Sequence, residues 1–128
     1  MTPEAHKLGS VLSYGGESVH TLANCIACEG LSEEQRFDFL HTALAELVRA
    51  GLVTWVLECD YGNKPAVKPS AFTPDCFEKD WSRCFPSTIR RHEVPDARNW
   101  TLFIDPTDDL GKALDDYYEL HPDTDYGW

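Results

Sequence analysis

Apolar residues recur at intervals of three and four along the first quarter of the chain, which is the spacing of helices with one buried side. The first run starts at Thr2-Pro3-Glu4, where a capping side chain precedes a proline that suits the first turn. Gly15-Gly16 end this run, and a second helix is predicted over Ser18 to Glu29, closed by Gly30. The buried positions expected in the two helices are Leu8, Val11 and Leu12, then Val19, Leu22, Ala23, Ile26 and Ala27.

The most regular pattern begins at Ser32. Ser32-Glu33-Glu34-Gln35 matches a capping box, in which the serine and glutamine side chains bond free amides at a helix start. Gly51 ends the helix, and Leu52 to Leu57 is predicted to be a strand because it is rich in β-branched and aromatic residues. The helix is expected to bury Phe37, Leu40, Leu44, Leu47 and Val48, and to expose Asp38, His41, Thr42, Ala45 and Arg49.

An irregular insertion is predicted over about residues 60–98, where prolines interrupt any long element. One short helix is expected there, from Thr73-Pro74-Asp75 toward Cys84. The large apolar side chains around it are too many to leave in water, so the insertion is expected to pack on the rest of the domain. These side chains are Phe72, Phe77, Trp81 and Phe85.

A second strand, Trp100 to Ile104, is followed by a closing helix that is expected to pack back on the first helix. Asp105-Pro106-Thr107-Asp108 has the form of a helix start, with Asp105 as the cap and Pro106 in the first turn. His121-Pro122 would end this helix, whose expected buried stripe is Leu110, Ala113, Leu114 and Tyr117.

Together these elements predict an α+β, mainly helical fold of three helices, a two-stranded antiparallel wing with the irregular insertion, and a closing helix. The chain of 128 residues suits one domain, 1–128, around one core. The order resembles the winged helix-turn-helix fold, on HTALAELVRAGLVTW at the end of the third helix and on WTLFIDPTDDLGKALDDYY at the closing strand and helix. The resemblance implies a third helix that enters the DNA major groove with basic residues on its exposed side.

The charge pattern opposes that implication. The net charge is −11, and Asp105 to Trp128 holds eight acids and one base. The exposed side of the third helix carries Asp38, with Glu33 and Glu34 at its start, so the phosphate backbone would be repelled and a basic protein attracted. The one basic patch is Arg90-Arg91-His92, with Arg83 and Arg98 nearby in sequence, and pairing with Glu93 and Asp96 explains it more simply than a contact with DNA.

Candidate chemistry is sparse. Cys25-x-x-Cys28 lacks the further ligands of a zinc site, and a thioredoxin-type role needs a preceding strand and a lowered thiol pKa, so packed, reduced thiols are favoured. The five histidines are scattered, and neighbouring acids such as Asp115-Asp116 point about 100° apart on a helix. No glycine-rich phosphate loop is present. We therefore expect no enzyme activity, no catalytic residue, no metal and no cofactor.

The acidic and aromatic C-terminal region is the predicted partner-binding surface. The overall profile is similar to that of the small acidic bacterial immunity proteins of contact-dependent growth inhibition systems. That similarity implies an immunity protein or antitoxin that occludes the active site of a basic toxin, with a nuclease as the expected toxin and neither nucleic acid nor membrane as a partner. The predicted surface residues are Asp108, Asp109, Asp115, Asp116, Tyr118, Glu119, Asp123, Asp125 and Tyr126.

Other interpretations stay open at this stage. The aromatic residues of the tail pack on their own domain in one of them, and a winged-helix transcription regulator is the alternative function, followed by a small enzyme or metal protein. The N-terminus shows no secretory signal and no apolar run approaches the roughly 20 residues that cross a bilayer, so a cytoplasmic location is expected.

Overall fold

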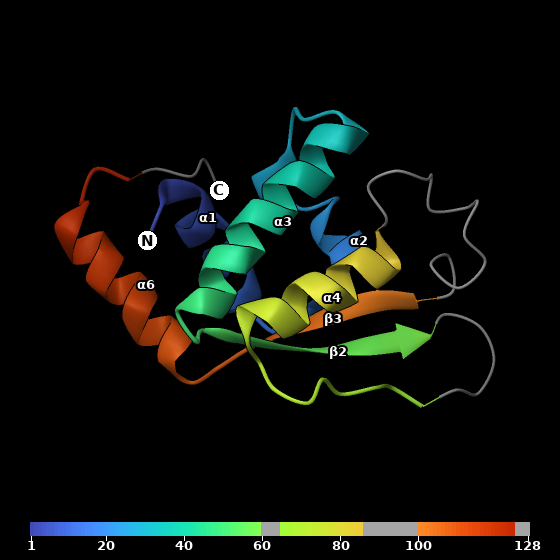
Figure 1. Cartoon of the computed structure of the whole chain (residues 1–128). Helices are drawn as coiled ribbons and strands as arrows, with labels where there is room; N and C mark the ends of the chain where they lie inside the picture. Colours follow the sequence, from blue (N-terminus) through green and yellow to red (C-terminus); the bar gives the residue numbers. More distant parts are fainter. Residues whose placement is uncertain (60–64, 86–99, 125–128) are drawn as a thin grey trace.

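The computed structural model of this chain describes residues 1–59, 65–85 and 100–124, which form an α+β fold of helices on an antiparallel sheet (Figure 1). The order of elements confirms the general class that the hydrophobic pattern predicts, while several boundaries differ. In the described residues the elements are α1 (Pro3–Leu12), β1 (Glu17–Ser18), α2 (Val19–Leu22), the 3-10 turn η1 (Ile26–Cys28), α3 (Glu33–Arg49), β2 (Val53–Cys59), α4 (Pro74–Cys84), β3 (Trp100–Pro106) and α6 (Asp109–Leu120).

Helix α3 is the centre of the fold, and its ends follow the local sequence. The predicted capping box is present: the Gln35 amide donates to Ser32 Oγ at 3.2 Å, and the Ser32 amide donates to Gln35 Oε1 at 2.9 Å. Gly51 ends the helix with φ of +71°, a left-handed conformation that a residue with a Cβ adopts only under strain. The predicted stripe is buried at Leu40, Leu44, Leu47 and Val48, whereas Phe37 is only half-buried.

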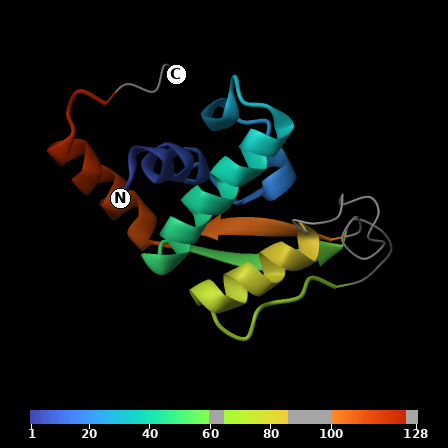
Figure 2. The same ribbon diagram turned by 45° about the horizontal axis from the view of Figure 1, so that its top comes forward.

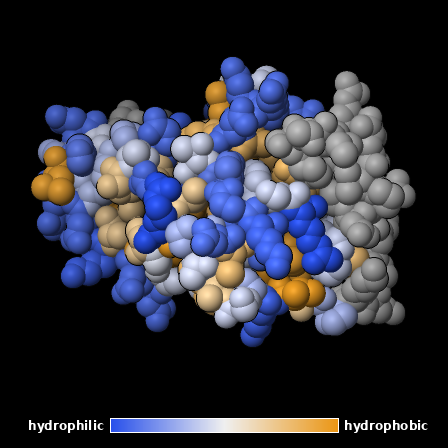
Figure 3. Space-filling model, viewed as in Figure 1, coloured by the Kyte–Doolittle hydropathy of each residue, from blue (hydrophilic) through white to orange (hydrophobic). Residues whose placement is uncertain are grey.

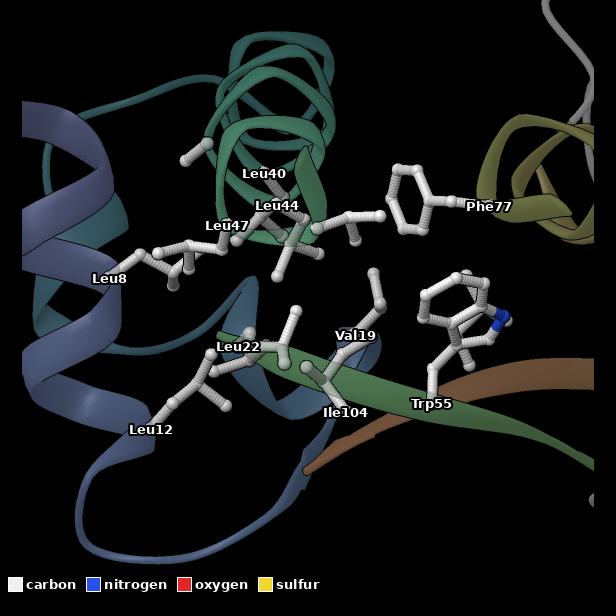
Figure 4. Packing of buried hydrophobic residues seen from close by; sticks show 14 of the residues in the cluster. Leu8, Leu12, Val19, Leu22, Leu40, Leu44, Leu47, Trp55, Phe77 and Ile104 are labelled. Atoms are coloured by element: carbon white, nitrogen blue, oxygen red, sulfur yellow. The ribbon is translucent and has the colours of Figure 1, made fainter. Parts of the chain in front are cut away.

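The core lies between α3 and the elements on three sides of it. Figure 4 shows leucines of α3 pointing toward leucines of α1, toward Phe77 of α4 and toward Trp55 and Ile104 of the sheet. Trp55 and Phe77 are fully buried, and their rings meet edge to face with centroids 5.5 Å apart. One hydrophobic cluster thus joins all of these elements.

The sheet has three strands in the order β1-β3-β2, so the prediction of two strands is wrong. β2 and β3 pair antiparallel, as predicted, with Trp55 opposite Ile104. Alternation along β2 turns Val53, Trp55 and Leu57 toward the helices, which lie over one face of the sheet (Figures 1 and 2). The third strand, β1, is only two residues long and pairs with β3 through Ser18 and Phe103.

The predicted helix over Ser18 to Glu29 is wrong, because its first residue, Ser18, joins the sheet and its middle is broken. Ser18 has an extended backbone, and its side chain accepts a hydrogen bond from the Thr21 amide, so the helix starts after it and lasts one turn. The Asn24 side chain donates to the carbonyl of His20, and Cys25 is again extended before η1. Ile26, expected in the buried stripe, is 36% exposed.

The predicted start of the closing helix is wrong by three residues. Asp105 and Pro106 continue β3 and lie opposite Thr54 and Val53 of β2, so Asp105 does not act as a cap. The helix begins at Asp109 instead. Its buried stripe is nevertheless the expected one, with Leu110, Leu114 and Tyr117 buried and Ala113 half-buried.

Helix α4 of the insertion is confirmed, and it changes the surface of α3. Thr73 caps α4, and Phe77 and Trp81 are buried, while Phe72 remains 46% exposed. His41 of α3 stacks on Trp81 with ring centroids 4.9 Å apart. The expectation that His41 and Ala45 face solvent is therefore wrong: both are half-buried, whereas Asp38, Thr42 and Arg49 are exposed as predicted.

Replacing Leu44 or Leu47 with alanine is expected to lower the free energy of unfolding by about 2–5 kcal/mol, because either change leaves a cavity beneath α3. Urea denaturation followed by circular dichroism measures the loss. Thr42→Ala, at an exposed position of the same helix, is the matched control and should change stability by less than about 0.5 kcal/mol. A leucine variant as stable as this control would contradict the central role of α3.

Candidate functional site

The candidate site is the outer face of α6, and its orientation is set by packing of α6 on α1, as predicted for the closing helix. A Cβ added at Gly9 would lie 3.1 Å from the Leu114 side chain and 3.3 Å from that of Leu110, so the glycine allows close approach of the two helices. His6, which is fully buried, stacks on Tyr117 with ring centroids 4.0 Å apart. Tyr117 in turn stacks on His121 at 4.2 Å.

A hydrogen bond completes this contact. His6 Nε2 lies 3.2 Å from the carbonyl oxygen of Leu114, and because a carbonyl only accepts, this nitrogen carries the proton. Burial lowers the pKa of His6 below its ordinary value of 6.5; the bond to Leu114 opposes that shift and His121 adds to it. The neutral ring is thus the form that holds α1 against α6.

Once α6 is anchored on its apolar stripe, its carboxylates must face outward. At about 100° per residue, Asp108, Asp115 and Glu119 fall on one line opposite the buried stripe, with Asp109 and Asp116 beside it. All five are exposed, as is Lys112, the single base of this helix. In the space-filling view of Figure 3, the side that α6 occupies in Figure 1 is mostly hydrophilic and is interrupted by a small apolar patch.

These carboxylates have no cationic partner within the described part of the chain. The close histidine–carboxylate contact found there, with a nitrogen–oxygen distance of 2.8 Å, joins His41 of α3 and Glu78 of α4. Within this row, Asp115 and Glu119 are four residues apart and repel each other. The last turn of α6 also contains no basic residue, so Glu119 lies where the helix dipole disfavours a negative charge.

The structure brings most of the predicted surface together. Asp123 follows the helix and is exposed, and Tyr118 is 44% exposed on the flank of the acidic face, with its ring edge-on to His6. The predicted residues Asp125 and Tyr126 lie outside the described residues. Two residues next to this surface were not identified from the sequence. Leu120 is 78% exposed at the end of α6, and His6 is buried between α1 and α6. The helical periodicity of α6 could have predicted that Leu120 is exposed, whereas no residue near His6 in the sequence indicates its contact with α6.

Elsewhere in the described residues, the surface is hollowed beside α2 and η1. Two shallow, open depressions of about 450 and 370 Å³ lie beside α2 and η1, and Asn24 and Cys25 line both. In residues 1–59, 65–85 and 100–124, no three histidine, cysteine or acidic side chains are grouped as metal ligands. Arg83 packs over the ring of Trp100 at 4.8 Å, while Arg90, Arg91, His92 and Arg98 lie outside the described residues.

No protein-family model matches this chain, and no curated protein or solved structure shows significant similarity to it. Among the described helices, none combines the length and the apolar character that crossing a membrane requires. The function therefore has to be inferred from the surface and its charges.

The pH dependence of stability is expected to report on His6. Because folding lowers its pKa, the unfolded chain takes up the proton more readily, so the stability due to the neutral ring is complete above pH 6.5 and is lost as the pH falls through the lowered folded value. His6→Gln should therefore show a shallower fall in unfolding free energy than the wild type below pH 6.5. Urea titrations at several pH values measure both slopes.

The two proteins should have equal slopes above about pH 7, where the ring is neutral in both the folded and the unfolded chain. This comparison separates the titration of His6 from the constant loss of packing in the variant. A nuclear magnetic resonance titration in which folded His6 has a pKa at or above 6.5 would contradict the assignment.

Proposed function

We propose that this protein is an immunity protein or antitoxin, which binds a basic toxin domain through the outer face of α6 and blocks its active site. The observation that carries the proposal is the row of exposed carboxylates on α6, none of which is in an ion pair within the described residues. Asp115 and Glu119 repel each other, and the helix dipole disfavours the charge of Glu119 in the last turn. A cationic partner would remove that repulsion on binding. Such a complex requires no chemistry from this chain.

Charge complementarity mainly increases the rate at which two proteins associate. A surface of one sign raises the association rate with an oppositely charged protein by about 10- to 1000-fold, and the attraction is screened over about 8 Å at physiological salt. Proteins that cleave nucleic acid have cationic clefts because they grip phosphates. An acidic helix face on a rigid domain suits such a cleft, and a nuclease toxin is accordingly the partner that we propose.

The alternative, a winged-helix DNA reader, has two observations against it. The exposed residues at the start of α3 are Glu33 and Glu34, which would meet phosphates with the wrong sign. α4 also packs along α3, where Glu78 accepts from His41 and Trp81 stacks on it. Both features work against entry of α3 into a major groove.

A gel-shift experiment separates these two functions. With random-sequence DNA at low salt, we expect no shifted band at micromolar protein, because non-specific binding depends on cations that displace counterions from the duplex. A basic winged-helix protein of known DNA binding serves as the positive control. A salt-sensitive shift with this protein would contradict the proposal and support the regulator.

The partner itself is sought by capture from extracts of the source cells with the tagged full chain. The expected result is a cationic protein whose toxicity or nuclease activity decreases when this protein is added. The triple variant Asp115→Lys, Asp116→Lys, Glu119→Lys should then bind that partner more weakly, chiefly through a slower association rate, and should fold normally. Surface plasmon resonance at several salt concentrations measures the two rate constants.

A second triple variant controls for net charge. Glu29, directly after η1, and Glu34 and Asp38 of α3 are exposed, and their reversal to lysine changes the total charge by the same amount. We expect this control to retain a faster association rate than the α6 variant. Equal losses in the two variants would show that general charge alone, and not the face of α6, attracts the partner.

A further inference from the structure

The two cysteines of Cys25-x-x-Cys28 lie in a setting that differs from the one predicted. In a continuous helix both thiols would simply pack beside the core, but the chain breaks before them and η1 follows. Cys25 is the N-cap residue of η1, with an extended backbone, and the Cys28 amide donates to the Cys25 carbonyl at 3.0 Å. This bond closes a tight turn with one cysteine at each end.

Such a turn brings the two residues into range for a disulfide. A turn closed in this way holds its first and fourth Cα atoms within about 7 Å, and disulfides commonly join Cα atoms about 4.4–6.8 Å apart. The two thiols are also close enough to form a side-chain hydrogen bond with each other. All five cysteines of the chain are free thiols in this structure, including this pair.

The two thiols differ in access. Cys25 is partly exposed and lines both shallow depressions, which are open to solvent. Cys28 is fully buried and belongs to the hydrophobic cluster. Burial, followed by the neighbouring Cys25 thiol, raises the pKa of Cys28 to about 11. The pair thus consists of an accessible thiol and a protected one beside it.

We propose that Cys25 and Cys28 form a dithiol site that a small-molecule disulfide oxidises to an intramolecular disulfide. The Cys25 thiolate attacks one sulfur of the reagent, which forms a mixed disulfide and releases the first thiolate. Cys28 then attacks the Cys25 sulfur and gives its proton to the departing sulfur of the reagent, which forms the Cys25–Cys28 bond and releases the second half of the reagent as a thiol. Two protein thiols are oxidised and one reagent disulfide is reduced to two thiols.

This site is independent of the proposed partner surface. α1 packs against η1 on one side and against α6 on another, so α1 separates the two regions. Oxidation would cross-link the ends of η1 at the border between the depressions and the core. Success or failure of this proposal therefore leaves the function proposed for α6 untouched.

The test uses the reduced full chain and glutathione disulfide under native conditions, followed by alkylation of the remaining thiols and peptide mass spectrometry. The wild-type peptide that contains Cys25 and Cys28 is expected to be lighter by two hydrogen atoms and not alkylated. A glutathione adduct that persists on Cys25 beside an alkylated Cys28, or two alkylated cysteines at the end of the reaction, would overturn the proposal.

Two variants assign the order of the steps. Cys28→Ala, which keeps an apolar group in the buried position, should retain the glutathione adduct on Cys25. Cys25→Ser should leave Cys28 unmodified over the same time, because Cys28 stays fully buried and burial, the largest cause of its raised pKa, persists in the variant. Rapid modification of Cys28 in this variant would contradict the proposed order.

Cys76 provides an internal control in every sample. It lies in the first turn of α4, where hydrogen bonds with Thr73 and with Ser70, whose Oγ is 3.8 Å from the sulfur, lower its pKa. We expect Cys76 to gain the glutathione adduct and to keep it, because its side-chain partners are hydroxyl groups rather than a thiol. An adduct on Cys76 shows that the reagent was active even where Cys25 gives no product.

Discussion

The burial of the apolar side of α3 is the interaction on which the other elements depend. Leu40, Leu44 and Leu47 are buried to within one per cent of their surface, and they contact α1, the sheet and α4 from a single helix. Interiors of proteins are packed as densely as organic crystals, so each of these neighbours takes its position from the shape of the α3 surface. Packing on α3 also fixes the position of α1, and α1 in turn contacts α6.

The position of α1 determines how α6 packs. Gly9 allows the two helices to approach, and His6 fills the contact with a neutral ring stacked on Tyr117. The charge pattern of α6 follows from that docking, because a helix that buries Leu110, Leu114 and Tyr117 must turn its carboxylates to solvent. Helix α1 therefore has two roles. It contributes to the core through its contacts with α3, and through Gly9 and His6 it fixes the orientation of α6.

The proposed binding face and the proposed dithiol site lie in different parts of the fold. The proposed binding face of α6 offers charge, and the turn at η1 offers an accessible thiol beside a buried one. α1 lies between them and contacts both.

The sequence by itself determined those elements whose caps and buried faces depend only on residues close together in the chain. The capping box at Ser32, the glycine at the end of α3, the cap at Thr73 and the buried stripe of α6 all depend on residues within a few positions, and the acidity of the last segment needs no structure at all. Tertiary contacts decided the rest. Pairing with β3 removed Ser18 from a helix, pairing with β2 kept Asp105 and Pro106 in a strand, α4 covered His41, and α6 buried His6. In each of these cases the partner that supplies the hydrogen bonds or the packing is distant in the chain, so its contribution outweighs a local preference that the pattern alone expresses.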